Sequence, residues 1–283
     1  MGSSTVTPVQ LGFDAMPRKL IKVTPSRLAT WVDCPRRFRM AYLDRPTPPR
    51  GGAWAHSTLG AVVHNALRAF FDLPVAKRTP EAAAALVGQH WSDEGFAGPA
   101  QAAEYRTRAA GWVADYVAEI DVSIEPIGLE RWVSAPVGTI VAEGRVDRID
   151  ERDGEVVIVD YKTGRSALTT DDARGSQALA LYVLAARRTL RKPCTRVELH
   201  HLPTGTVAAW EHTEESLTRH RTRAEEAAEE FHLATDTLNA GGDPDVLFPA
   251  RVGRQCSWCD FRRSCPEGQA AGPAAEPWAM LTP

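Results

Sequence analysis

A strand that ends in two opposite charges constrains this 283-residue chain more than any other feature. Residues 156–164 read VVIVDYKTG, an apolar run followed by an Asp-Tyr-Lys triplet. Because side chains on a strand alternate between faces, Asp160 and Lys162 point the same way and Tyr161 points the other way. An ion pair at the surface would contribute little there. The sharper interpretation is a metal-binding carboxylate beside a catalytic lysine.

The spacing of the apolar residues around this strand predicts an α/β fold. Helical spacing predicts helices over 24–42, 58–73, 80–94, 101–121, 172–190 and 214–238. Alternation predicts strands over 128–136, 138–150, 155–162, 195–202 and 206–213. We expect turns at Pro136 to Gly138 and at Pro203 to Gly205. This order indicates a mixed central sheet flanked by helices.

Composition is that of a globular protein, since 43% of the residues are hydrophobic and 24% are charged, and the length allows one large domain or two small ones. Residues 1–22 are rich in proline and polar residues and are expected to form a flexible arm. We expect a single domain over 23–268 and a flexible tail, rich in proline and alanine, over 269–283.

Several classes of protein are disfavoured. The sequence has no run of eighteen apolar residues, so we expect no transmembrane helix. Its first twenty residues lack the apolar core of a secretory signal, and Val6 departs from the myristoylation pattern. We therefore expect a cytoplasmic protein without a membrane partner. A net charge of −3 argues against a uniformly basic nucleic-acid binder, although short basic runs occur at 34–45, 187–192, 219–223 and 260–265.

A second carboxylate is expected beside Asp160. If the ERDG turn pairs Asp150 with Glu155, then Asp147 lies opposite Ile158 and Asp160 is its diagonal neighbour on the same face. Diagonal neighbours lie about 7–8 Å apart, within reach of one shared cation. Two such carboxylates would repel each other without a cation, and hard oxygen ligands suit Mg²⁺ or Mn²⁺.

Cysteines form a second candidate site. Cys256, Cys259 and Cys265 make a C-x2-C-x5-C pattern, and the first pair can hold one metal centre on a tight turn. A fourth ligand would be Cys34 or Cys194. Zinc is one alternative, but two-knuckle zinc sites show paired C-x2-C units, so the spacing favours an iron–sulfur cluster.

GRVDRID and VVIVDYKTG, preceded by GAVVHNAL, resemble the RecB branch of the PD-(D/E)XK nucleases. The resemblance implies a mixed sheet between helices, His64, Asp147 and Asp160 as metal ligands, the Tyr161 carbonyl as a further ligand, and Lys162 as the catalytic lysine. Such nucleases also carry a glutamine on the next helix, usually four residues before a tyrosine. The corresponding residues here are Gln177 and Tyr182, five apart.

The cysteines extend the resemblance to iron–sulfur nucleases of the AddB and CRISPR-adaptation type. One N-terminal cysteine and a C-terminal C-x2-C-x5-C bracket the nuclease core in both. This implies a [4Fe–4S] cluster that joins the segments 23–45 and 251–268, and leaves Cys194 as an ordinary apolar residue. The implied ligands are Cys34, Cys256, Cys259 and Cys265.

These features predict a metal-dependent deoxyribonuclease, with an exonuclease on single-stranded DNA in repair or recombination as the favoured activity. We expect Arg36, Arg37 and Arg39 to contact the DNA backbone, with Phe38 and Tyr42 stacking on bases. Tyr182 is a further expected DNA contact. The sequence has no G-x-x-x-x-G-K-[ST] loop, so any unwinding would come from a helicase or recombination partner. The alternative is a non-catalytic DNA-binding subunit with a structural cluster, against which the Asp-x-Lys triplet argues.

Overall fold

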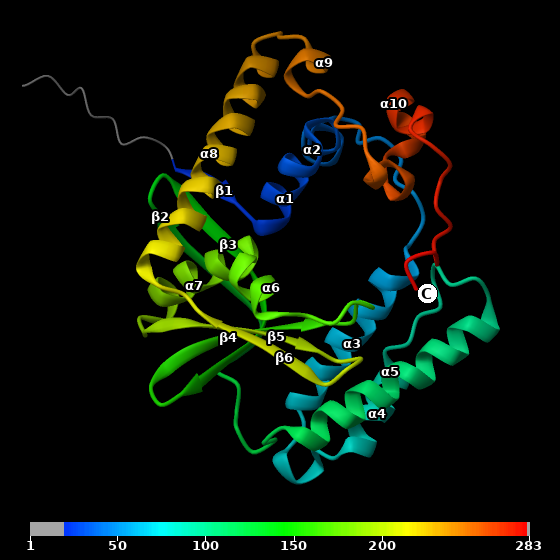
Figure 1. Cartoon of the computed structure of the whole chain (residues 1–283), viewed down its shortest axis with the longest axis vertical. Helices are drawn as coiled ribbons and strands as arrows, with labels where there is room; N and C mark the ends of the chain where they lie inside the picture. Colours follow the sequence, from blue (N-terminus) through cyan, green and yellow to red (C-terminus); the bar gives the residue numbers. More distant parts are fainter. Residues whose placement is uncertain (1–19, 282–283) are drawn as a thin grey trace, which may run out of the picture.

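The computed structural model describes residues 20–281, which form one sheet between two groups of helices (Figure 1). The strands of the sheet are β1 (Ile21–Val23), β2 (Gly128–Val137), β3 (Ile140–Arg152), β4 (Glu155–Lys162), β5 (Cys194–His201) and β6 (Thr206–Glu211). The helices are α1 (Pro25–Asp33), α2 (Pro35–Tyr42), α3 (Ala55–Phe71), α4 (Pro80–Gln89), α5 (Pro99–Glu119), α6 (Thr170–Gly175), α7 (Gln177–Leu190), α8 (Glu214–Asn239), α9 (Pro244–Leu247) and α10 (Pro266–Ala270). Short 3₁₀ turns lie at Val75–Lys77, Arg254–Trp258 and Arg262–Ser264.

The sheet is mixed, as the order of the elements predicted. Its order is β1-β3-β4-β5-β6, and β2 pairs with the other edge of β3. β2 pairs with one edge of β3 along most of its length. The other edge of β3 pairs with β1 near its start and with β4 near its end. β1 and β5 run parallel to their partners β3 and β4, whereas the other pairs are antiparallel.

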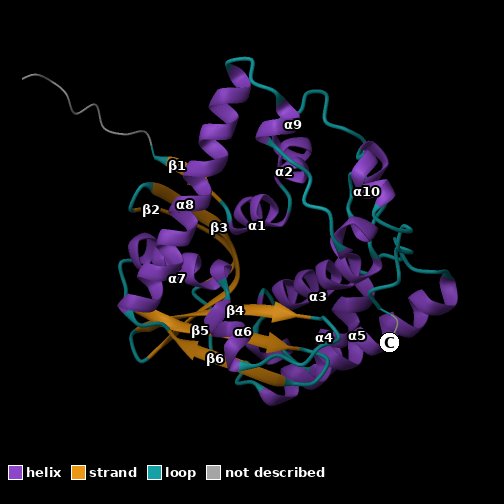
Figure 2. Ribbon diagram, turned by 45° about the horizontal axis from the view of Figure 1, so that its top comes forward, coloured by secondary structure: helices purple, strands orange, loops and turns teal. Residues whose placement is uncertain are grey.

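Helices cover both faces of the sheet (Figure 2), and a hydrophobic core lies between each group of helices and the sheet. Helices α1, α7 and α8 pack on one face, against Ile149 and Ile158 among others. Helices α3, α4 and α5 pack on the other face, against Val157, Val159 and Tyr161. The apolar run of β4 therefore faces a core on both sides, which explains why it does not alternate with polar residues.

The β3–β4 hairpin differs from the predicted register by two residues. Arg152 pairs with Glu155, so the loop is the dipeptide Asp153-Gly154 and not the four residues ERDG. Both loop residues have positive φ, 52° and 83°, as a tight hairpin turn requires, and Asp-Gly is a strong signal for that turn. Continuing the register places Asp147 directly opposite Asp160, where a diagonal relation was predicted. A shift of two residues keeps both side chains on the same face.

Other boundaries also differ from the sequence-based expectations. β1 was not predicted, and the first hairpin turns at Gly138 with Pro136 inside β2. The segment predicted as one helix from 24 to 42 breaks at Cys34, because Pro35 has no amide hydrogen and disfavours helical geometry in the preceding residue. The helix predicted over 172–190 likewise divides at Ser176, which caps α7 through its hydroxyl.

The C-terminal segment packs on the domain, although a flexible tail was predicted. The Tyr105 hydroxyl donates a 2.5 Å hydrogen bond to the Leu281 carbonyl, and the Ala55 amide donates to Pro277. Leu281 and Trp278 join the core beneath α3 and α5, so burial of these apolar side chains holds the segment in place. Within residues 20–281, no helix combines the length and the apolar character needed to cross a membrane.

Candidate active site

The edge of β3 between β1 and β4 carries the candidate active site. The β3–β4 ladder ends at the pair Arg148 and Val159, and beyond it β4 continues alongside β5 alone. The Tyr161 amide, which has no β3 carbonyl as a partner, donates to Oδ2 of Asp147 at 3.0 Å. This bond fixes the Asp147 carboxylate against the end of β4.

His64 reaches the same point from α3. Its Nε2 lies 3.1 Å from the Tyr161 carbonyl and must donate to it, because a carbonyl oxygen only accepts. Its Nδ1 then faces the carboxylates, 3.5 Å from Asp147 and 3.8 Å from Glu130. In the neutral imidazole this leaves the Nδ1 lone pair directed at the position where a cation would sit.

Glu130 of β2 completes the group, although the sequence alone was equally compatible with a surface residue on the strand before Asp147. Within the described residues, one set of three metal-ligating side chains has ligand atoms all within 4.8 Å: His64, Glu130 and Asp147. Glu130 lies opposite Asp147 between two regular β2–β3 pairs, and its φ of 45° is left-handed. The correct β2–β3 register would have placed Glu130 opposite Asp147, but the turn of this hairpin was predicted to begin at Pro136, two residues before Gly138. Arg145 contacts the other Glu130 oxygen at 2.7 Å.

Asp160 and Lys162 form an ion pair at the end of β4, as their shared face predicted. The Asp160 side chain is 16% exposed, whereas the Lys162 side chain is 45% exposed. Asp160 is not in the three-residue set, because its carboxylate lies against Lys162. A cation between Asp147 and Asp160 would compete with the lysine for this carboxylate, leaving its ammonium free for another anion.

The charges at this edge are unfavourable without a cation. Burial raises the pKa of Asp160 and the Asp147 charge adds to this, although Lys162 opposes it. Burial and Asp147 likewise raise the pKa of Glu130. Burial lowers the pKa of His64, but hydrogen bonding to Asp147 and its charge outweigh burial and raise it overall. Three carboxylates, which are hard oxygen donors, together with one imidazole nitrogen fit a divalent cation such as Mg²⁺ or Mn²⁺.

Of the two residues predicted on α7, only Tyr182 faces the carboxylates. Burial, together with the charges of Asp160 and Asp147, raises the pKa of Tyr182 to about 12. Gln177 instead donates from its amide to the His220 carbonyl of α8, 2.8 Å away. Ala178 stands four residues before Tyr182, so no amide occupies that place on the helix.

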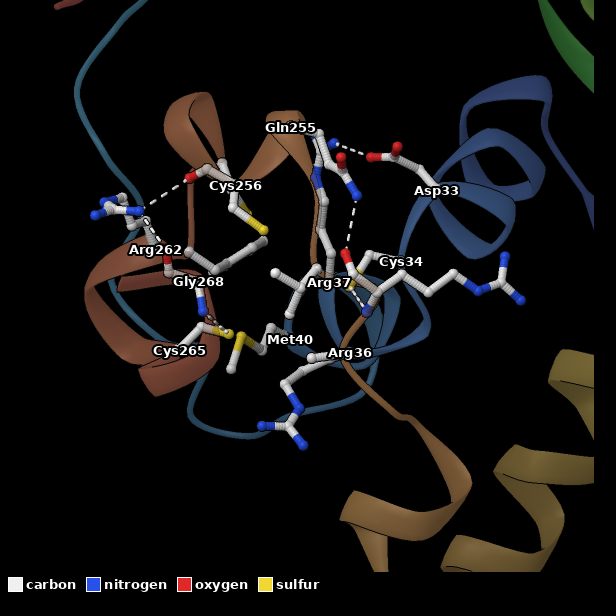
Figure 3. Close-up of a pocket in the computed structure, with 15 residues that line it drawn as sticks. Asp33, Cys34, Arg36, Arg37, Met40, Gln255, Cys256, Arg262, Cys265 and Gly268 are labelled. Atoms are coloured by element: carbon white, nitrogen blue, oxygen red, sulfur yellow. Dashed lines mark hydrogen bonds and ion pairs between the residues drawn. The ribbon is translucent and has the colours of Figure 1, made fainter. Parts of the chain in front are cut away.

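The four predicted cluster cysteines line one pocket between α2 and the C-terminal segment (Figure 3). Backbone amides donate to two of their sulfurs, from Arg251 to Cys34 at 3.5 Å and from Gly268 to Cys265 at 3.3 Å. A tetrahedral zinc with Zn–S bonds of about 2.3 Å would hold its sulfurs roughly 4 Å apart. Among the described residues, no three cysteine sulfurs lie within 4.8 Å of one another.

Cys194 lies outside that pocket. It was interpreted as a loop residue, but it is the first residue of β5 and is fully buried in the core. Burial raises the pKa of its thiol to about 12, as expected of a packing residue.

The predicted DNA-contacting residues of α2 are mostly engaged within the protein. Arg36 is 8% exposed and makes two 2.8 Å bonds to the Glu267 carboxylate. Arg39 contacts Asp245 at 3.3 Å, and Arg37 contacts Asp33 at 3.0 Å. The suggestion that Phe38 stacks on bases is wrong, because its side chain is fully buried against Trp31 and Phe231.

A family model identifies the superfamily of this chain. The family model described as the PD-(D/E)XK nuclease superfamily matches residues 22–266. Among solved structures, a candidate exonuclease from Eubacterium rectale is 11% identical, with a TM-score of 0.46, over 77% of this chain and 84% of that chain. A protein named SSO0001 is 16% identical, with a TM-score of 0.37, over 87% of this chain and 85% of that chain. No curated protein matches. The chain belongs to the PD-(D/E)XK nuclease superfamily.

Proposed function

We propose that this protein is a metal-dependent deoxyribonuclease of the RecB branch, and that it acts as an exonuclease on single-stranded DNA in repair or recombination. The observation that carries the proposal is the convergence of His64, Glu130, Asp147 and the Asp160–Lys162 pair at one sheet edge. A DNA-binding subunit without activity would have no use for carboxylates whose burial disfavours their charge.

The side chains of the site have different roles in cleaving a phosphodiester bond. His64, Asp147 and Asp160, with Glu130 as an added candidate, would hold Mg²⁺ or Mn²⁺, and the Tyr161 carbonyl lies beside them. A divalent ion in this position supplies Lewis-acid polarisation of the phosphate.

Lys162 is half exposed and lies at the rim of the site, where its ammonium can orient an attacking water or stabilise negative charge on the phosphate. The Tyr161 amide holds the Asp147 carboxylate in place throughout.

Cys34, Cys256, Cys259 and Cys265 would hold a [4Fe–4S] cluster, whose chemistry here is structural. Supporting this are their shared pocket and the amides directed at two of the sulfurs. The cluster would join α2 to the C-terminal segment. A helicase or recombination partner and a cytoplasmic location remain part of the proposal.

Purified protein incubated with end-labelled single- and double-stranded DNA in Mg²⁺ or Mn²⁺ tests the activity. Wild-type protein should degrade single strands, and chelation with EDTA should stop it. Asp160→Ala and Lys162→Ala should each abolish cleavage while circular dichroism and iron content stay unchanged, because neither residue is a core side chain. Full activity in either variant would refute the catalytic assignment, and binding without cleavage by wild-type protein would favour a DNA-binding subunit.

A further inference from the structure

A second surface feature begins where the catalytic strand ends. The four residues that follow Lys162, Thr163 to Ser166, line a groove together with Arg108 and Trp112 of α5 and Pro203 of the β5–β6 loop. We call this the α5 groove. Its lining combines aromatic and guanidinium groups beside a chain segment that leads directly out of the candidate active site.

The α5 groove presents a stacking surface. The guanidinium of Arg108 lies 4.6 Å from the ring centroid of Tyr105 and 5.5 Å from that of Trp112. Arg108 is exposed, and its contact with Glu104 is long, at 3.5 Å. Trp112 is half-buried, so one part of its ring is held by the protein while another part stays accessible. Guanidinium and indole planes of this kind stack with any nucleic-acid base.

The opposite side of the α5 groove offers contacts for phosphate. Arg165 and Ser166 are exposed there, and the chain carries no acidic residue from Thr163 to Thr170. A guanidinium and a hydroxyl beside a stacking surface match the two parts of a nucleotide, the charged backbone and the flat base.

The loop that forms this side is held in position. His201 is 1% exposed and its Nε2 donates to the Gly164 carbonyl at 2.6 Å, since a carbonyl accepts. Its Nδ1 then accepts from the Thr204 hydroxyl at 2.7 Å. The Leu202 amide also donates to the Lys162 carbonyl at 2.9 Å. The α5 groove is therefore present before any ligand binds, which reduces the entropy lost on binding.

Its distance from the reacting position fits a short piece of DNA. Arg165 is three residues beyond Lys162, which at extended spacing is at most about 10 Å. Leu59 also lines the α5 groove, and it lies five residues before His64 on α3, or about 7.5 Å along the helix. A strand with its scissile phosphate at Lys162 would place a neighbouring nucleotide here.

We propose that the α5 groove binds one or two nucleotides of single-stranded DNA that flank the scissile phosphate, with a base stacked on Trp112 and Arg108 and a phosphate bound by Arg165. The proposal rests on the nuclease function proposed above and deepens it. Bases in a duplex are already paired and stacked, so this site selects single strands without reading their sequence.

The test measures affinity and cleavage for Trp112→Ala, Trp112→Phe and Arg165→Ala. A matched control is Trp210→Ala, because Trp210 is also half-buried and lies 5.7 Å from a guanidinium, that of Arg174, but lies outside the α5 groove. Binding is followed by the anisotropy of a labelled oligothymidine in EDTA, with a DNA duplex as a second probe. Melting temperatures establish that each variant is folded.

Trp112→Ala should weaken binding to the single strand about 5- to 150-fold, the cost of losing one stacked base. Its KM for single-stranded DNA should rise with kcat unchanged, its duplex affinity should stay unchanged, and Trp112→Phe should recover most of the loss. Arg165→Ala should reduce the slope of log affinity against log salt by about 0.7, the value for one phosphate contact on a single strand.

Two results would overturn the α5 groove as a DNA site: wild-type affinity in Trp112→Ala, or an equal loss in Trp210→Ala. The nuclease proposal fails separately, if the wild-type protein cleaves neither single nor double strands with Mg²⁺ or Mn²⁺. Cleavage by wild-type protein combined with normal binding by Trp112→Ala would reject only the groove.

Discussion

Replacing Cys34 with serine should lower stability, because Cys34 would be the single cluster ligand supplied by the N-terminal half of the chain. It lies between α1 and α2, and the other three cysteines follow α8 and α9. By subtraction of their residue numbers, Cys34 and Cys256 are separated by 222 residues. A covalent link across a loop of this length lowers the entropy of the unfolded chain. In the chain-entropy model this stabilises the folded state by about 5 kcal/mol at room temperature.

That value is an upper limit, because other contacts join the same segments without sulfur. Arg36 binds Glu267, and Arg251 donates to the Val32 carbonyl. At about 2–4 °C for each kcal/mol in a domain of this size, we expect Cys34→Ser to lower the melting temperature by at most about 10–20 °C. Iron content should fall in parallel, and so should the broad absorbance near roughly 400 nm that iron–thiolate sites show.

Cys194→Ala is the matched control. Cys194 is fully buried at the start of β5, so serine there would bury a hydroxyl in an apolar core, whereas alanine removes only one sulfur atom. The alanine variant should keep its iron and lose only about 1 kcal/mol of stability. Both variants are purified anaerobically, assayed for iron and zinc, and melted. Retained iron in Cys34→Ser, loss of iron in Cys194→Ala, or stoichiometric zinc in the wild type would each refute the reasoning.

Three further changes probe the active-site edge. In metal-free protein Asp160→Asn should be more stable than wild type at pH 7.5. The pKa of Asp160 is higher in the folded than in the unfolded protein, so the wild type loses stability as the pH rises through the folded pKa and the carboxylate ionises. Urea melts in EDTA should show this advantage vanishing below about pH 4, where both forms are neutral; a less stable variant at pH 7.5 would contradict it. Glu130→Gln should weaken Mn²⁺ binding at least about 10-fold by calorimetry, and unchanged affinity would remove Glu130 from the ligand set. Gly144→Ala should cost about 1–3 kcal/mol, because the new Cβ would lie 2.6 Å from the Tyr182 ring. The double variant with Tyr182→Ala should recover part of that loss in thermal melts, and simple additivity would argue against the clash.

The sequence was sufficient where local chemistry decides the outcome. The alternation rule placed Asp160 and Lys162 on one face, and they form an ion pair there. The apolar run before them is buried on both sides of the sheet. Asp147 joins them because a shift of two residues in the register preserves the face, so an incorrect pairing still gave the correct side.

The features that could not be predicted from the sequence depend on contacts between distant segments. β1 has only three residues and exists because β3 offers it a free edge, so no local pattern marks it. Arg36 belongs to a basic run that reads as a surface for DNA, yet Glu267 lies 231 positions away and neutralises it. Gln177 stands one residue away from the place that the family pattern gives a glutamine, and its amide is bonded to a helix that begins 37 residues later. Each of these outcomes required the fold before the partner could be known.

The unfavourable charges of the site are tolerated because the sheet beneath them is held by charges that are paired. Arg148 and Asp150, 4% and 0% exposed, bond to each other at 2.6 Å on the opposite face of β3. Arg152 then joins Asp150 to Glu198 of β5, with 2.8 Å bonds to each. Burial alone would raise the pKa of Glu198, but hydrogen bonds from His200 and Arg152 outweigh it and hold that pKa well below its usual range. Glu198 therefore stays ionised at neutral pH, and its bonds with Arg152 tie β3 to β5 across β4. Since β3 and β4 are fixed from that side, Asp147 and Asp160 stay close on the other side, where a bound cation would reduce the repulsion that Lys162 offsets only at Asp160.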